Sequence, residues 1–320
     1  SAEIVNRHLK VTRADRWLLA LPYWHVGGFG VACRAFEAGC GLSELEGRWD
    51  PRSFAGQLSA CGATCTSLVP TQVHDLVRAG VVSPPGLRAV VVGGGALSEQ
   101  TGQEARALGW PVLQSYGMTE TASQVATASL TSLEETFRGG PLPVLPGWDT
   151  ELGAEGELRI RGEALFAGYV EEQGDQVELV EGPRDGWFAT RDRVSLSDEG
   201  LTFEGRLDRT VKVLGELVDL EAVEAGLREM AGPRGDVFVV SRPDERAGVR
   251  IVPVVCGDET AWQQIVPRFN EGQAGYARLE VPLILPEIPK TALGKPDLAA
   301  LRQIVDEKWP SGLSSGGNSN

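Results

Sequence analysis

Short apolar runs alternate with amphipathic stretches of about ten residues in the first part of the chain. The apolar runs predict buried strands, at residues 17–21, 64–69, 87–92 and 111–114. The stretches between them predict helices, at residues 51–60, 71–78 and 98–108. Alternation of this kind produces a parallel sheet, whose ligands lie at the carboxyl ends of the strands. We therefore expect ligand-binding residues in the segments that begin at Gly93 and Ser115.

A second pattern begins after about Pro146, where short β segments are separated by glycines. These segments are residues 156–162, 187–190, 193–196 and 201–204. The last two read as a hairpin that turns at Asp198–Gly200, a short polar sequence ending in glycine. The pattern predicts a small β subdomain.

A third pattern starts near Arg206 and extends over a length typical of a small domain. It predicts strands at residues 210–214, 236–240, 249–256 and 280–285, and helices at 220–230, near 260–270 and from 297. We therefore predict an α/β fold with a large N-terminal domain, residues 1–205, and a small α+β C-terminal domain, residues 206–310. The N-terminal domain combines a parallel sheet and helices with the small β subdomain. Residues 311–320, rich in Ser and Gly, predict a disordered tail.

Charge and cysteine usage exclude several classes of partner. The chain carries 30 Lys and Arg against 44 Asp and Glu, a net charge of −14, which argues against binding to nucleic acid or anionic lipid. No apolar run approaches the roughly 18 residues that span a bilayer. The five cysteines show no CxxC spacing, as expected of reduced thiols in a cytoplasmic protein. An anionic ligand must therefore meet a local positive site.

The segment Ser115–Glu120 carries groups that suit a nucleotide. It projects an aromatic ring, Tyr116, a hydroxyl, Thr119, and a carboxylate, Glu120, from the end of a predicted strand. A ring can pack on a base, a hydroxyl can bind a phosphate oxygen and a carboxylate can hold Mg²⁺. The same segment is equally compatible with a turn in which Thr119 starts a capped helix.

Two further segments support a ligand site more weakly. The strand Val91–Val92 continues into Gly93–Gly95, and glycines allow a ligand to approach the backbone closely. The alternative is an ordinary tight turn, since neither GxGxxG nor GK[ST] is present. Asp192 follows a strand and can accept hydrogen bonds from the two hydroxyls of a ribose, although an isolated Asp is also a common turn residue.

Lysine is scarce in a chain that prefers arginine. There are five lysines against 25 arginines, and three of the five, Lys212, Lys290 and Lys295, lie in the segments 205–212 and 289–295. A lysine kept in this background suggests that a compact and mobile cation is needed there. Random placement is the alternative.

Taken in order along the chain, these segments resemble the adenylate-forming acyl-CoA synthetase superfamily. The matching segments are residues 21–25, 93–95, 116–120, 156–162, 187–192, 205–212 and 289–295. Within the superfamily the chain is most similar to the o-succinylbenzoate-CoA ligases of menaquinone biosynthesis. This finer similarity rests on Ser67–Gln72, Tyr116–Gln124 and Ala189–Arg193, where most members of the superfamily would read Thr-Gly-Asp.

The resemblance implies an AMP-forming acid–thiol ligase that uses ATP, Mg²⁺ and CoA. Such an enzyme converts a carboxylate and ATP to an acyl-adenylate and pyrophosphate, and the CoA thiol then attacks the activated carbonyl. The resemblance implies nucleotide contacts by Gly94, Gly95, Ala96, Tyr116, Thr119, Asp192 and Arg206, with Glu120 binding Mg²⁺. Other roles follow from the same source: Lys295 in adenylation, Lys212 in thioester formation, Asp208 as the hinge of a mobile C-terminal domain, and His25 as a gate of the acyl pocket.

The second carboxylate of o-succinylbenzoate requires donors or a cation. Ser123 is the better candidate for this role. Arg34 is the other candidate, although a solvated arginine on a helix is the favoured interpretation of that residue. The substrate is thus a small carboxylic acid, and a homodimer is compatible with the sequence.

The sequence also departs from the superfamily pattern. Nothing in it matches the Ser/Thr/Gly-rich phosphate loop that normally precedes the Leu21–His25 motif, so the chain either starts after that loop or lacks it. At Gly215–Glu216 relatives often carry a longer glycine run. Two alternatives therefore stay open: a ligase or carrier-loading adenylation domain for another acid, and a non-catalytic protein that binds a nucleotide or an acyl group.

Overall fold

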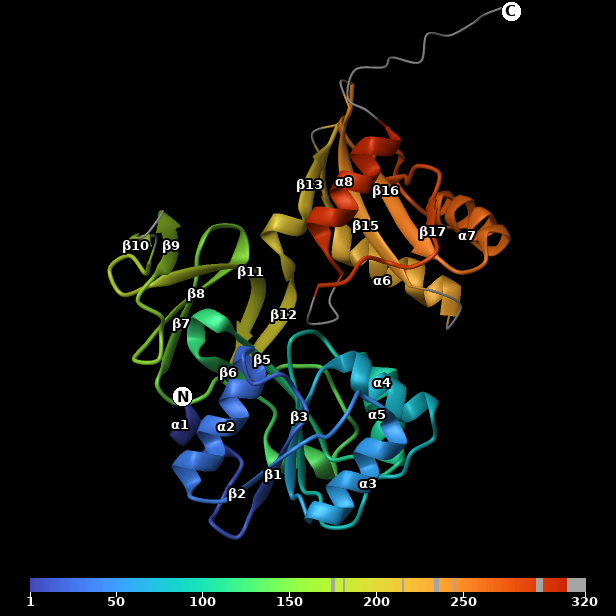
Figure 1. Cartoon of the computed structure of the whole chain (residues 1–320). Coiled ribbons are helices and arrows are strands. Elements are labelled where there is room, and N and C mark those ends of the chain that lie inside the picture. Colours follow the sequence, from blue (N-terminus) through green and yellow to red (C-terminus); the bar gives the residue numbers. More distant parts are fainter. Residues whose placement is uncertain are drawn as a thin grey trace, which may run out of the picture. The chain divides into compact units, whose positions relative to one another are not determined.

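The computed structural model describes residues 1–173, 176–180, 182–214, 216–232, 236–244, 246–291 and 296–309. The chain divides into two compact units, Ser1–Glu204 and Gly205–Asn320 (Figure 1). Lys295 and Gly215, both discussed above, lie outside the described residues, as does the segment predicted to be a disordered tail. Among the described residues, no helix is long and apolar enough to cross a bilayer.

A six-stranded sheet forms the centre of the first unit. In spatial order its strands are β2 (Gly41–Glu44), β1 (Arg16–Leu19), β3 (Cys65–Leu68), β4 (Ala89–Val92), β5 (Val112–Met118) and β6 (Ser123–Thr127). The neighbours from β2 to β5 are parallel, and β6 runs antiparallel to β5. The predicted α/β class with a parallel sheet is confirmed. Strands β3 and β4 are buried along their whole length, because both faces of the sheet are covered there.

Helices cover both faces of this sheet. They are α1 (Ala2–His8), α2 (Val26–Ala38), α3 (Pro51–Cys61), α4 (Pro70–Arg78) and α5 (Glu99–Ala107). One core places α1 and α2 against the side of β4 that carries Val91. The other places α3, α4 and α5 against the side that carries Val90 and Val92. The order of elements thus gives the α/β layering that the alternating pattern predicted.

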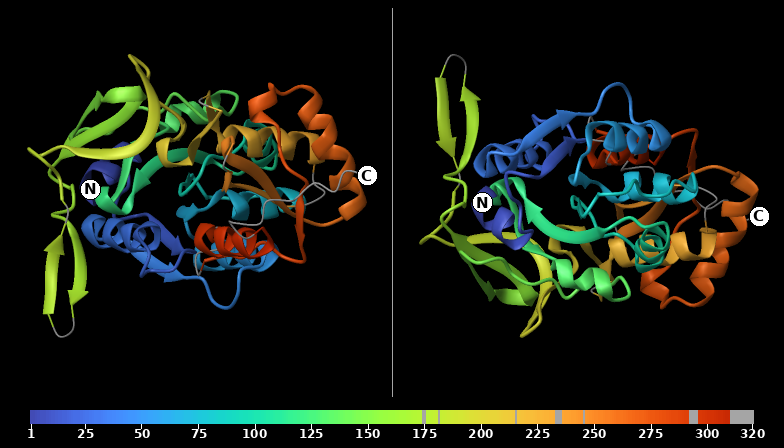
Figure 2. Two further views of the ribbon diagram at one scale, coloured as in Figure 1. Left: turned by 90° about the horizontal axis from the view of Figure 1, so that it is seen from above. Right: turned by 90° about the horizontal axis from the view of Figure 1, so that it is seen from below.

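The segments rich in glycine form a smaller antiparallel sheet. Its order is β12 (Gly200–Arg206), β11 (Phe188–Ser197), β8 (Glu157–Gly162) and β7 (Trp148–Leu152). A separate two-stranded hairpin, β9 (Tyr169–Gln173) and β10 (Gln176–Val180), projects from this region (Figure 2).

The second unit is an α+β fold with its own core. It contains β13 (Thr210–Val213), β14 (Glu216–Asp219), α6 (Leu220–Ala231), β15 (Val237–Asp244), β16 (Gly248–Cys256), α7 (Glu259–Glu271), β17 (Leu283–Leu285) and α8 (Leu298–Lys308). Strands β15, β16 and β17 form one sheet. Helices α6 and α7 pack on one face of it, and α8 packs on the other. The adenylating role of the first domain and the mobility of the second stay predictions.

Candidate functional site

The tyrosine motif lies on a strand that continues past its predicted end. We predicted a strand over residues 111–114, but β5 runs on to Met118 and pairs with β6. A Cβ atom at Gly117 would lie only 1.7 Å from the carbonyl oxygen of Ser123, so this irregular pairing requires glycine. Thr119–Thr121 then forms a short 3-10 helix, η1, which begins at Thr119 as the alternative interpretation predicts.

Tyr116 and Asp192, two residues expected to bind the nucleotide, are in contact within the first unit. The Tyr116 hydroxyl donates a hydrogen bond of 2.6 Å to Asp192 Oδ2, although 76 positions separate the two residues. Asp192 lies on β11 with 4% of its surface exposed. The Tyr116 ring is half-buried and its centre lies 6.2 Å from that of Phe203. The pair therefore combines an aromatic surface with a carboxylate that can accept hydrogen bonds from more than one hydroxyl.

The glycine run lies at the carboxyl end of β4, where ligands of parallel sheets bind. Gly94, Gly95 and Ala96 are exposed between two buried residues, Val92 and Leu97. Gly94 has a φ angle of +76°, a backbone conformation that favours glycine. The loop therefore offers peptide groups, rather than side chains, to a ligand.

The carboxylate of Glu120 is held by a residue that the sequence analysis did not assign. Tyr169, at the start of β9, donates a hydrogen bond of 2.7 Å from its hydroxyl to Glu120 Oε1. The Tyr169 ring packs edge-on against Phe166, with 4.9 Å between ring centres, and the Phe166 amide donates to the Glu120 carbonyl over 2.8 Å. Thr119 is exposed beside Glu120. A single oriented carboxylate suits Mg²⁺, which is typically held by one or two carboxylates together with the phosphates of a nucleotide.

Arg34 is buried, and here the favoured interpretation was wrong. We expected a solvated helix arginine, but Arg34 is on the inner face of α2 with 2% of its surface exposed. Its Nη1 donates to Ser67 Oγ over 3.3 Å and its Nη2 donates to Ser123 Oγ over 3.1 Å. The guanidinium carbon lies 5.3 Å from the centre of the Trp17 ring. The helix turns this side chain inward because the residues next to it on that face, among them Val31 and Ala35, form part of the core.

No carboxylate among the described residues lies within ion-pair distance of this guanidinium. Burial lowers the pKa of Arg34 to about 10, so the group still carries its charge at neutral pH. A buried charge without a counter-ion is costly and usually marks a binding function. A Cβ atom at Gly30 would lie 3.0 Å from Arg34 Nη2, so glycine keeps the space beside the guanidinium open. Ser123 pairs with Met118 in the sheet, which places this cluster next to the tyrosine motif.

His25 caps the N-terminus of α2. Its Nδ1 accepts a hydrogen bond of 3.2 Å from the Gly27 amide. Tyr23 and Trp24, which precede it, are exposed by 61% and 73%. The cap fixes the imidazole at the start of the helix that carries Arg34, and its role as a gate stays a prediction.

In the second unit, two of the predicted residues bind each other. Arg206 Nε lies 2.8 Å from Asp208 Oδ1, and Arg206 Nη2 lies 3.0 Å from Asp208 Oδ2. The next residue, Arg209, is buried and forms an ion pair with Glu224 on α6. Lys212 is exposed on β13. The roles predicted for Arg206, Asp208 and Lys212 stay predictions, as does that of Lys295.

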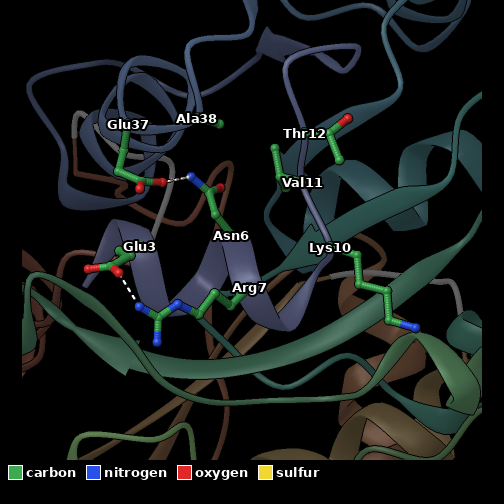
Figure 3. A pocket seen from close by; sticks show the side chains of 8 residues that line it. All are labelled: Glu3, Asn6, Arg7, Lys10, Val11, Thr12, Glu37 and Ala38. Atoms are coloured by element: carbon green, nitrogen blue, oxygen red, sulfur yellow. Dashed lines mark hydrogen bonds and ion pairs between the residues drawn. The ribbon is translucent and has the colours of Figure 1, made fainter.

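A cavity of about 310 Å³ lies apart from these residues, between α1, the segment that follows it and the end of α2 (Figure 3). Its side chains carry both charges, among them Lys10, Glu37 and the ion pair of Arg7 with Glu3. None of the residues predicted for the site lines this cavity. It therefore does not coincide with the candidate site.

Sequence reasoning missed Ser67, Gln114 and Tyr169 as residues of the site. Ser67 and Gln114 had a recognisable signal, because each is a polar residue within a predicted buried strand, at residues 64–69 and 111–114. Tyr169 carried no such signal. Its contact with Glu120 joins residues 49 positions apart in the chain.

Comparison with known proteins gives one family and several relatives. Residues 1–170 match the family described as AMP-binding enzyme. The chain is 28% identical over 299 residues to the 2-succinylbenzoate–CoA ligase of Listeria monocytogenes, a match that covers 92% of this chain and 62% of the relative. It is 34% identical over 242 residues to the 2-succinylbenzoate–CoA ligase of Escherichia coli, which covers 75% of this chain and 49% of the relative. The chain therefore spans less than two thirds of the length of these relatives.

Among solved structures, an E. coli MenE variant with bound OSB-AMS is similar to this chain. The TM-score is 0.75 and the sequence identity is 29%, over 96% of this chain and 64% of that one.

Proposed function

Because the chain belongs to the family of AMP-binding enzymes, we propose that it activates o-succinylbenzoate with ATP and transfers the acyl group to CoA. The first step forms a bond between a carboxylate oxygen and the α-phosphorus and releases pyrophosphate. In the second step the CoA thiol attacks the acyl carbon and AMP leaves. The product would be o-succinylbenzoyl-CoA, an intermediate of menaquinone biosynthesis. The names of the relatives support this choice of acid.

One observation carries the proposal: a buried arginine without a counter-ion lies beside the tyrosine motif. O-succinylbenzoate keeps an aromatic carboxylate while the succinyl carboxylate reacts, so the pocket must bind one anion without activating it. The guanidinium of Arg34 can bind a carboxylate through two parallel hydrogen bonds. Ser67 and Ser123 orient it by accepting from different terminal nitrogens. An acid without this second carboxylate would leave the charge uncompensated.

The nucleotide is proposed to bind at the carboxyl ends of β4 and β5. Tyr116 would pack on the adenine beside Gly94, Gly95 and Ala96, and Asp192 would accept from the ribose hydroxyls. The hydrogen bond from Tyr116 to Asp192 supports this arrangement, because it fixes the ring and the carboxylate relative to each other.

Mg²⁺ is proposed to bind at Glu120, where it would neutralise charge on the phosphates. Thr119 would donate its hydroxyl to the α-phosphate. Among the described residues, no group of three or more His, Cys, Asp or Glu side chains could hold a metal ion alone. This fits a Mg²⁺ that is bound largely through the nucleotide. Lys295, Arg206, Asp208 and Lys212 keep the roles that the resemblance implies, as proposals.

The test is exchange of pyrophosphate into ATP, measured with o-succinylbenzoate and Mg²⁺ and without CoA. Exchange that depends on the acid supports adenylation, and thioester formation after CoA is added supports the full reaction. A panel of other aryl and acyl acids separates this proposal from a ligase of different specificity. If the protein catalyses no exchange with any acid, the proposed activity is refuted.

A second candidate function is binding of an acyl-adenylate without catalysis. It is the alternative that the sequence analysis left open. Calorimetry with a non-hydrolysable acyl-adenylate, together with the exchange assay, distinguishes the two functions. Binding without exchange would support this second candidate.

We propose a cytoplasmic location, supported by the five cysteines, all of which are free thiols. The association of two copies is a further proposal, which sedimentation velocity would test.

A further inference from the structure

Gln114 is buried on β5, two residues before Tyr116. The residue is 5% exposed, and its amide group lies against the glycine loop that follows β4. The amide oxygen, Oε1, accepts a hydrogen bond of 2.9 Å from the backbone amide of Leu97. The amide nitrogen, Nε2, donates to the carbonyl oxygens of Gly95 and Ser115 over 3.1 Å each, with that of Val92 at 3.4 Å.

These partners define which way the amide points. A flipped side chain would place Oε1 against three carbonyl oxygens and Nε2 against an N–H donor. Gln114 therefore binds both the middle of the loop, at Gly95, and its end, at Leu97.

The loop has few other attachments. The Gly93 amide donates to the Leu68 carbonyl over 3.1 Å, at the point where the loop leaves β4. Among the described residues, Gln114 is the one side chain that hydrogen-bonds to the backbone of residues 93–97. Glycines lose more conformational freedom on ordering than other residues, so a loop with three of them needs an anchor if it is to keep one shape.

We propose that Gln114 is a positioning residue that fixes the peptide groups of Gly94–Ala96 for recognition of the adenine base. This inference rests on the proposed function, since it assumes that a nucleotide binds at the loop. The edge of adenine carries both donors and acceptors, and fixed backbone groups can complement them. Because Gln114 orders the loop before the ligand arrives, binding need not supply that ordering. Gln114 thus acts on base selectivity through the loop and touches no reacting atom.

The experiment measures binding of AMP and UMP to the full chain by calorimetry. The two ligands share the ribose and the phosphate and differ in the base. Gln114→Leu removes both kinds of hydrogen bond to the loop, and we expect AMP binding to weaken about tenfold, since one hydrogen bond contributes about 0.5–1.5 kcal/mol. Binding of UMP should change less than about twofold, because the ribose and phosphate contacts remain.

Gln114→Glu provides a second variant and a signature that a general loss of stability would not give. An ionised carboxylate cannot donate to Gly95, but a protonated one both donates and accepts. Burial raises the pKa of a carboxyl group. We therefore expect Gln114→Glu to bind AMP weakly at pH 8 and to recover toward the wild-type affinity at pH 5, relative to the wild-type protein at each pH.

The matched control is Gln124→Leu on β6. Gln124 is also buried, at 3% exposure, but its side chain donates to Thr127 Oγ1 and not to the loop. The Gln124→Leu substitution should reduce the stability of the protein without changing the ratio of AMP affinity to UMP affinity. Equal loss of both ligands in Gln114→Leu, or unchanged AMP affinity, would overturn the inference alone. Wild-type protein that binds neither nucleotide would refute the proposed function instead.

Discussion

Replacement of Arg34 by methionine should reduce substrate affinity without reducing stability. Methionine fills most of the space of the arginine chain and removes the guanidinium. In the folded protein Nη1 and Nη2 each donate to one serine, so each keeps a further N–H for a ligand. Two hydrogen bonds to a carboxylate contribute about 1.5–3 kcal/mol each. Arg34→Met should therefore raise the KM for o-succinylbenzoate more than about 100-fold.

The stability of this variant should move in the other direction. Arg34 buries a positive charge for which no described carboxylate provides a counter-ion, so an apolar side chain there should leave the free energy of unfolding unchanged or raise it. The assay is the KM for each acid in pyrophosphate exchange, together with urea unfolding. The control acid is 4-oxo-4-phenylbutanoate, which lacks the aromatic carboxylate. Its KM should change less than about threefold in Arg34→Met.

Two results would refute this reasoning. Equal loss of affinity for both acids would show that Arg34 does not bind the aromatic carboxylate. A fall of more than about 2 kcal/mol in the free energy of unfolding would show that the arginine mainly stabilises the fold.

Three further predictions concern the metal site, the acyl pocket and the sheet. Tyr169→Phe keeps the ring but removes the hydroxyl that donates to Glu120. The Mg²⁺ concentration that gives half-maximal pyrophosphate exchange should therefore rise about fivefold. An unchanged Mg²⁺ dependence would contradict this prediction. Gly30→Ala places a methyl group against the buried guanidinium of Arg34. The KM for o-succinylbenzoate should rise about tenfold, and the KM for ATP should stay unchanged. Equal changes in the two KM values would contradict this prediction. Asp15→Asn breaks the ion pair with Arg88 and should lower the free energy of unfolding by about 2 kcal/mol. Burial alone would raise the pKa of Asp15, but hydrogen bonds, the strongest from Arg88, hold it well below its usual range. The ionised carboxylate of Asp15 therefore stabilises the wild-type protein above about pH 4, and this contribution is lost at lower pH. The free energy of unfolding, measured with urea, should fall less steeply with acid in Asp15→Asn than in the wild-type protein.

Periodicity predicted most elements of both units because their cores are built from short apolar runs. Helix α3 was found within one residue of its observed end, since Asp50 caps its start and Gly62 ends it. The bounds of helix α2 were not predicted, because Gly27, Gly28 and Gly30 lower the helix propensity of its first turns. The structure explains one of these glycines: a Cβ atom at Gly28 would lie 2.2 Å from the Pro22 carbonyl oxygen.

The site could be predicted only as a set of residues, because its contacts join distant parts of the chain. The bond between Tyr116 and Asp192 depends on how the two sheets of the first unit pack, and no local pattern encodes it. The orientation of Arg34 depends on which face of helix α2 is buried. Polar residues within predicted buried strands were a further local signal, and Gln114 and Ser67 both carried it.

The β9–β10 hairpin has a bearing on how the protein behaves in concentrated solution. Among the strands that the structure describes, each strand of the hairpin pairs with one neighbour and leaves its other edge open. One face carries Val170, Val177 and Leu179 with at least 60% exposure. On the opposite face Glu171 and Glu178 stand directly across from each other. Like charges at this position weaken the hairpin slightly, but they also repel a second copy that approaches edge to edge. Resistance to aggregation at this ribbon is thus supported by two carboxylates on the face opposite its exposed apolar side chains.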